Sequence, residues 1–90
     1  MILEELESVL QERRSAAATE SYTARLLADP ELVQRKIMEE AFEVCLELGR
    51  DDNARVADEA ADLIYHLLVG LVGAGIPLTD VLAVLEGRRA

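Results

Sequence analysis

Residues 29–72 read DPELVQRKIMEEAFEVCLELGRDDNARVADEAADLIYHLLVGLV and predict two long helices joined by a tight turn. The opening aspartate and proline are a typical helix start, because aspartate accepts a hydrogen bond at the N-cap and proline has no N–H to leave unpaired. Gly49 is the matching stop, and the polar residues after it can cap a second helix. We therefore expect antiparallel helices over residues 30–48 and 54–72.

The flanking segments predict shorter helices. Apolar residues at every third or fourth position indicate an amphipathic helix over residues 2–14. Ser21 can cap a short helix that runs to residue 27. A last helix over residues 78–88 follows the breakers Gly73, Gly75 and Pro77. Because strand signals are absent, we expect an all-α single domain over residues 1–90, a bundle of four to five helices around the central antiparallel pair.

Helical periodicity also predicts which apolar residues face the core. In the first long helix the inward stripe comprises Val33, Ile37, Ala41, Val44 and Leu48. In the last helix it comprises Leu78, Val81, Leu82 and Leu85. Cys45 lies in an otherwise aliphatic stretch, and we expect it to be a small core residue.

Composition excludes several classes of protein. The chain has 90 residues with 18 acidic against 9 basic side chains, a net charge of −9, whereas nucleic-acid binding needs a basic surface. One cysteine excludes a disulfide scaffold and fits a reducing cytoplasm. The first ten residues lack the basic start and apolar run of a signal peptide. We expect a cytoplasmic protein that binds neither nucleic acid nor membrane.

Apolar residues are more abundant than so small a domain can bury. They make up 51% of the chain, and a domain of this size buries roughly 60 to 65% of its unfolded surface. The uncharged run over residues 63–79 is interrupted by glycines and a proline, so we interpret it as a buried helix whose outer side meets another subunit. The expected assembly is a homodimer.

Acidic residues are concentrated around the predicted turn. Half of them lie in one segment: Glu39, Glu40, Glu43, Glu47, Asp51, Asp52, Asp58, Glu59 and Asp62. Helical spacing places Glu40 and Glu43 on one face of the first long helix. Glu59 and Asp62 share a face of the second, and antiparallel packing can bring the two faces together. Four carboxylates would then converge on one point.

Such convergence is unfavourable without a cation. Two carboxylates 4 Å apart repel by about 1 kcal/mol in water and by about 4 kcal/mol at an effective dielectric of 20. All-oxygen ligands favour Mg²⁺ or Mn²⁺ over zinc. A ferritin-like di-iron centre needs Glu-x-x-His repeats, and the one histidine, His66, has no glutamate three residues before it. A merely solvated acidic surface is the open alternative.

The segments that carry these acids resemble the EExxE and ExxD signature of the MazG-type all-α nucleoside triphosphate pyrophosphohydrolases. They are KIMEEAFE at residues 36–43 and EAADLIYHLLV at residues 59–69. Within that superfamily, ESYT at residues 20–23 and the DLIYHLLV run are similar to the phosphoribosyl-ATP pyrophosphohydrolase family. The likeness extends over nearly the whole chain.

The resemblance implies Mg²⁺-dependent hydrolysis of phosphoribosyl-ATP to phosphoribosyl-AMP and pyrophosphate, the second step of histidine biosynthesis, in a homodimeric helical assembly. Carried over by position, it makes metal ligands of the same four residues that helical spacing selects: Glu40, Glu43, Glu59 and Asp62. Glu39 and Glu40 are candidates for orienting or deprotonating the attacking water.

The candidate substrate-binding residues are Lys36, Tyr22, Thr23, Arg35 and His66. Lys36 can reach a phosphate or pair with a neighbouring glutamate. Tyr22 and Thr23 match the family motif and can line a nucleotide site or brace the chain. His66 can contact the substrate or be a hydrogen-bonded core histidine. Candidate partners for the phosphate on the ribosyl group are Arg14, Arg25, Arg35, Arg88 and Arg89.

Two other functions fit the same features. A house-cleaning hydrolase of aberrant nucleoside triphosphates would use the same metal ligands with a different pocket for the base. A non-catalytic helical dimerisation module would carry the acids only for solubility.

Overall fold

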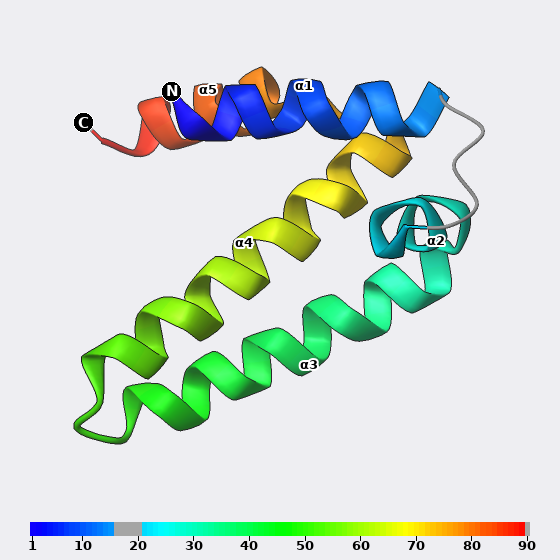
Figure 1. Cartoon of the computed structure of the whole chain (residues 1–90). Coiled ribbons are helices and arrows are strands. Elements are labelled where there is room, and N and C mark those ends of the chain that lie inside the picture. Colours follow the sequence, from blue (N-terminus) through cyan, green and yellow to red (C-terminus); the bar gives the residue numbers. More distant parts are fainter. Residues whose placement is uncertain (16–20, 90) are drawn as a thin grey trace.

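The computed structural model describes residues 1–15 and 21–89, and all the regular structure in this part of the chain is helical (Figure 1). The elements are α1 (Ile2–Ser15), α2 (Tyr22–Ala28), α3 (Pro30–Leu48), α4 (Asn53–Ala74) and α5 (Leu78–Arg88). The prediction of an all-α fold is confirmed, and the element bounds agree with the expected ones to within two residues.

The antiparallel pair α3 and α4 forms the long axis of the molecule, and local sequence signals set its ends (Figure 1). The Asp29 side chain accepts a hydrogen bond from the Leu32 amide at 3.2 Å, and Pro30 occupies the first turn of α3. Asp52 does the same for the Arg55 amide at the start of α4. Each aspartate satisfies a backbone N–H that its helix leaves unpaired, so the N-terminal ends of α3 and α4 are both capped, and the cap on α4 adjoins the turn.

The apolar core lies at the end of this pair remote from the turn. Its fully buried members come from all five helices: Leu10, Leu26, Val33, Leu68, Val69, Val72 and Leu78. Gly70 lets α3 and α4 approach closely here, since a Cβ at this position would lie 3.2 Å from the Ile37 Cδ1 atom and 3.3 Å from a Val33 methyl. The half of the pair nearer the turn extends away from α1 and α5 (Figure 1).

A corner after α4 completes the core. Gly75 has a φ of +73°, a left-handed conformation that ends α4 at little cost for glycine, whereas Gly73 stays inside the helix and does not break it. α1 holds the corner with two polar contacts: Glu7 accepts from the Leu78 amide and Arg14 donates to the Val72 carbonyl, both at 2.8 Å.

Three predictions of buried apolar residues are wrong. Leu48 is 66% exposed, and Leu85 and Cys45 are also exposed. Leu48 and Cys45 lie in the last turns of α3, which extend away from α1, α2 and α5, and α4, the helix alongside them, leaves both side chains exposed. The remaining members of the α3 stripe are buried or half-buried, as predicted.

Apolar side chains also remain exposed on the outer faces of the long helices. They are Met38, Phe42 and Leu46 on α3, and Ile64 and Leu67 on α4. In the described part of the chain no single helix is both long and apolar enough to span a membrane. α4 and α5 meet the requirements of length and composition only together, as a pair bent by 119°.

Candidate metal centre

Charged side chains line the seam between α3 and α4 on the side of the turn. α3 contributes Glu40, Glu43 and Glu47, and α4 contributes Arg55, Glu59 and Asp62. Spacings of three and four residues keep each set on one helical face. Because the helices are antiparallel, the two sets face each other in reverse order. We call Glu40, Glu43, Glu59 and Asp62 the acidic cluster.

Three members of the acidic cluster converge. Glu40, Glu59 and Asp62 each offer a carboxylate oxygen within 4.8 Å of the others, close enough to share one cation. Glu43, the fourth predicted ligand, lies outside this group of three but is half-buried, and its charge acts on Glu59. The structure therefore brings together three of the four predicted ligands, one from α3 and two from α4.

Glu59 carries the electrostatic cost of this arrangement. Partial burial raises the pKa of the Glu59 carboxyl, and the charges of Glu40, Asp62 and Glu43 raise it further, together with a hydrogen bond to Glu40. A carboxylate among like charges favours either a proton or a cation. Because all the donors are hard oxygens, this chemistry fits Mg²⁺ or Mn²⁺.

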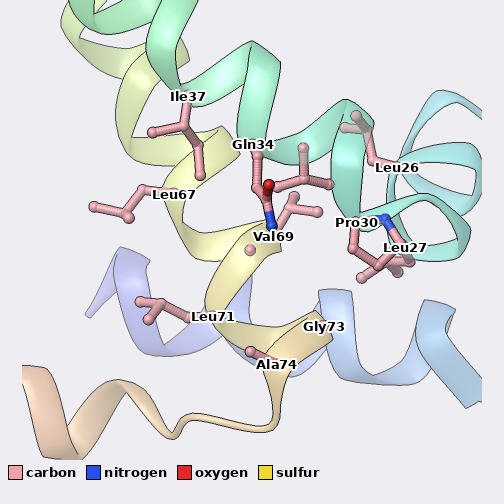
Figure 2. A pocket seen from close by; sticks show the side chains of 12 residues that line it. Leu26, Leu27, Pro30, Gln34, Ile37, Leu67, Val69, Leu71, Gly73 and Ala74 are labelled. Carbon is pink, nitrogen blue, oxygen red and sulfur yellow. The ribbon is translucent and has the colours of Figure 1, made fainter.

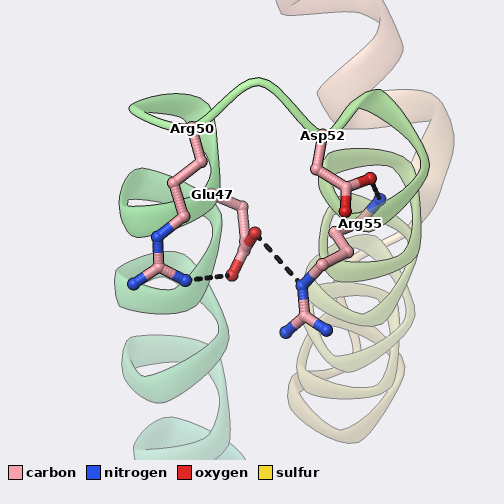
Figure 3. A network of polar contacts seen from close by, with 4 residues as sticks. All are labelled: Glu47, Arg50, Asp52 and Arg55. Atoms are coloured by element: carbon pink, nitrogen blue, oxygen red, sulfur yellow. Dashed lines mark hydrogen bonds and ion pairs between the residues drawn. The ribbon is translucent and has the colours of Figure 1, made fainter.

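Further along the same seam, towards the turn, Glu47 forms a charge network that the sequence analysis did not predict (Figure 3). Glu47 is only 1% exposed. Its Oε1 accepts a hydrogen bond from Arg50 Nη1 at 3.0 Å and its Oε2 accepts one from Arg55 Nε at 3.2 Å. Two guanidinium groups thus compensate for the desolvation of one buried carboxylate. This hydrogen bond and the charge of Glu47 raise the pKa of Arg55.

A sequence signal for this network existed. Glu47 follows Glu43 by four residues and Arg55 precedes Glu59 by four, so each lies on the same helical face as the cluster. The two charges are opposite and meet across the turn.

Two other predicted site residues lie at the edge of the cluster. Glu39 is exposed and falls outside the converging group. Its Oε2 lies 3.5 Å from Lys36 Nζ, so the pairing with a neighbouring glutamate is the arrangement observed for Lys36.

Tyr22, Thr23 and His66 link α2 to α4. His66 Nδ1 lies 2.7 Å from the Asp62 carbonyl oxygen, which can only accept, so Nδ1 donates. Nε2 is hydrogen-bonded to the Tyr22 hydroxyl, with the two atoms 2.8 Å apart. The hydroxyls of Thr23 and Tyr65 are also hydrogen-bonded. Thr23 and His66 are buried, whereas Tyr22 remains partly exposed.

The arginines considered for the phosphate of the ribosyl group do not gather at one place. Arg14 is bonded to the Val72 carbonyl, the Arg25 guanidinium carbon lies 5.9 Å from the Tyr22 ring centroid, and Arg89 pairs with Glu86 at 2.6 Å. Arg35 and Arg88 are exposed on α3 and α5.

An apolar pocket lies away from the acidic cluster (Figure 2). It has a volume of about 330 Å³ and lies among α2, α3 and the distal half of α4. Apart from Gln34, the lining residues are apolar or glycine. It therefore offers no cationic group to a phosphate.

Comparison with known proteins shows similarity to one family over nearly the whole chain. A family model described as phosphoribosyl-ATP pyrophosphohydrolase matches residues 3–89. A phosphoribosyl-ATP pyrophosphatase of Cereibacter sphaeroides (strain ATCC 17029) is 47% identical over 89 residues, covering 98% of this chain and 86% of that protein. One from Pyrobaculum arsenaticum is 48% identical over 90 residues, covering 98% and 95%. One from Methylobacterium nodulans is 44% identical over 87 residues, covering 96% and 81%.

Proposed function

This chain belongs to the phosphoribosyl-ATP pyrophosphohydrolase family, and on that premise we propose that it hydrolyses phosphoribosyl-ATP to phosphoribosyl-AMP and pyrophosphate. That reaction is the second step of histidine biosynthesis. The observation that supports the assignment in this chain is the convergence of Glu40, Glu59 and Asp62 at the seam of α3 and α4.

The acidic cluster is proposed to hold Mg²⁺, for which Mn²⁺ can substitute. A cluster of carboxylates repels a triphosphate, so it can serve a phosphate substrate only through a cation. When bound, the ion would neutralise phosphate charge and polarise the anhydride between the α and β phosphorus atoms. The four carboxylates of Glu40, Glu43, Glu59 and Asp62 would hold it.

The chain's own residues have the remaining roles. Glu40, in the cluster, and Glu39, at its exposed edge, are proposed to orient the attacking water and accept its proton. Lys36 and Arg35 lie on the same helix and are proposed to contact phosphate oxygens. Tyr22 is the proposed substrate contact from α2.

Burial favours a supporting role for Thr23 and His66. Both are engaged in hydrogen bonds between α2 and α4, and His66 bonds the backbone of the cluster residue Asp62. We propose that they hold α2 and Tyr22 in position beside the cluster.

The assembly is proposed to be a homodimer. The exposed apolar residues Met38, Phe42 and Leu46 recur at intervals of four along α3, which is the pattern of a helix face that packs against another protein surface. Sedimentation of the wild type against Phe42→Glu tests this, and a wild-type monomer at micromolar concentration contradicts it. The proposed location is cytoplasmic, since one cysteine cannot form a disulfide within the chain.

One assay tests the activity. Pyrophosphate release is measured with phosphoribosyl-ATP and with a panel of nucleoside triphosphates, in Mg²⁺ and in excess chelator, for the wild type and Glu43→Gln. We expect preference for phosphoribosyl-ATP, dependence on Mg²⁺ and loss of activity in the variant. Preference for the panel would instead indicate a house-cleaning hydrolase. No metal-dependent release from any substrate would indicate a dimerisation module.

A further inference from the structure

The network of Glu47, Arg50 and Arg55 is buried on one side and open on the other. The carboxylate of Glu47 is enclosed, with each oxygen bonded to a different guanidinium. The side chains of Arg50 and Arg55 are 61% and 59% exposed. Both Nη atoms of Arg55 point away from Glu47 (Figure 3). Most donors of the two guanidinium groups thus face solvent while their orientation is fixed by a buried acid.

This pair of arginines adjoins the acidic cluster. Glu47 lies four residues beyond Glu43, and Arg55 lies four residues before Glu59, a rise of about 6 Å along the helix in each case. The charge of Glu59 contributes to the raised pKa of Arg55, so the two groups interact.

Arg50 and Arg55 are the only basic residues between Glu39 and Asp62, a segment with nine acidic residues. Besides Glu47, the charges of Asp52 and Glu59 act on Arg55. This segment repels a polyphosphate unless cations are present, and the two guanidinium groups are the cations that the chain itself supplies. A substrate that brings a polyphosphate can bind the metal and the arginines together.

We propose that Arg50 and Arg55, oriented by Glu47, bind a phosphate group of the substrate next to the metal centre. The inference rests on the proposed function and extends it with a site outside the metal ligands. Arginine suits this role because its planar fork bonds two phosphate oxygens at once. Glu47 is a positioning residue that touches the guanidinium groups and not the substrate.

The test compares Arg55→Gln, Arg50→Gln and the double variant with Arg13→Gln, which removes the same charge from the exposed surface of α1. We expect the KM for phosphoribosyl-ATP to rise about tenfold in each single variant, with a smaller change in kcat. Arg55→Lys should recover part of the loss, because it keeps the charge without the fork. The Mg²⁺ concentration for half-maximal rate should stay level or fall, and Arg13→Gln should resemble the wild type.

Product binding identifies the phosphate and does not require turnover. Calorimetry measures Mg²⁺-pyrophosphate and phosphoribosyl-AMP binding to the wild type and the double variant. Weaker pyrophosphate binding assigns the arginines to the leaving end of the substrate, and weaker phosphoribosyl-AMP binding assigns them to the retained end. If the double variant has a wild-type melting temperature, KM and affinity for both products, the proposal is wrong.

The proposal can still be tested if one variant does not fold or if the wild type is inactive. If Arg55→Gln does not fold, Arg50→Gln still tests the proposal, because Arg55 remains bonded to Glu47 in that variant. If the wild type proves inactive on phosphoribosyl-ATP, the proposed function fails. The pyrophosphate titration then still decides whether the arginines bind phosphate.

Discussion

The two halves of the α3–α4 pair share one helical register but differ in chemistry. In the half remote from the turn, Val33 and Ile37 lie against Gly70, and a close apolar contact joins the helices. In the half near the turn, carboxylates face one another and raise the pKa of Glu59. The first contact stabilises the pair and the second opposes it. The difference indicates that burial at one end of a helical hairpin offsets electrostatic repulsion at the other.

The remote half should dominate stability. Leu68→Ala removes a buried side chain of the core cluster from the remote half of α4, and we expect a loss of about 2 to 5 kcal/mol in the free energy of unfolding. Leu48→Ala, at an exposed position near the turn, should change it by less than about 0.5 kcal/mol. Urea unfolding monitored by circular dichroism measures both, and equal losses would contradict the division into two halves.

The half near the turn should dominate activity. Glu40→Gln, Glu43→Gln, Glu59→Gln and Asp62→Asn should each lower turnover about 100-fold or more, because the metal loses a ligand. Their metal-free melting temperatures should equal or exceed that of the wild type, since repulsion is relieved. Asp58→Asn is the matched control, because it neutralises an exposed acid of α4 outside the cluster. Wild-type turnover in two of the four variants would refute the ligand set.

The smallest expected effect is the pH dependence of metal-free stability. The folded-state pKa of Glu59 is raised above its ordinary value of 4.5, so this residue's stabilising contribution is complete below that pH and is lost as the pH rises through the folded value. In chelator, the melting temperature of Glu59→Gln should therefore exceed that of the wild type by a margin that grows as the pH rises above 4.5. Saturating Mg²⁺ should abolish it, and an advantage independent of pH would contradict the assignment of the shift to Glu59.

Local signals made the backbone predictable from the sequence. Asp29 with Pro30 and Gly49 delimit α3, because caps and breakers act within a few residues of the helix ends they satisfy. The exposure of Leu48, Cys45 and Leu85 was not predictable in this way. Periodicity identifies an apolar stripe, but it does not say whether the stripe meets the core, another subunit or water.

The acidic cluster was predictable because it also depends on local spacing. The arginine network was not predicted. The spacings of Glu40 with Glu43 and Glu59 with Asp62 are contained within single helices, and one tight turn fixes which helices meet. The pairing of Glu47 with Arg55 depends on the register across that turn. Neither helix alone sets that register, so local sequence signals do not predict the pairing.

The core at the end remote from the turn contains no atom of the acidic cluster or of the arginine network. Selection for folding and selection for chemistry therefore act on separate sets of residues in this chain. The charged side chains near the turn can therefore be substituted while the apolar scaffold at the other end stays intact.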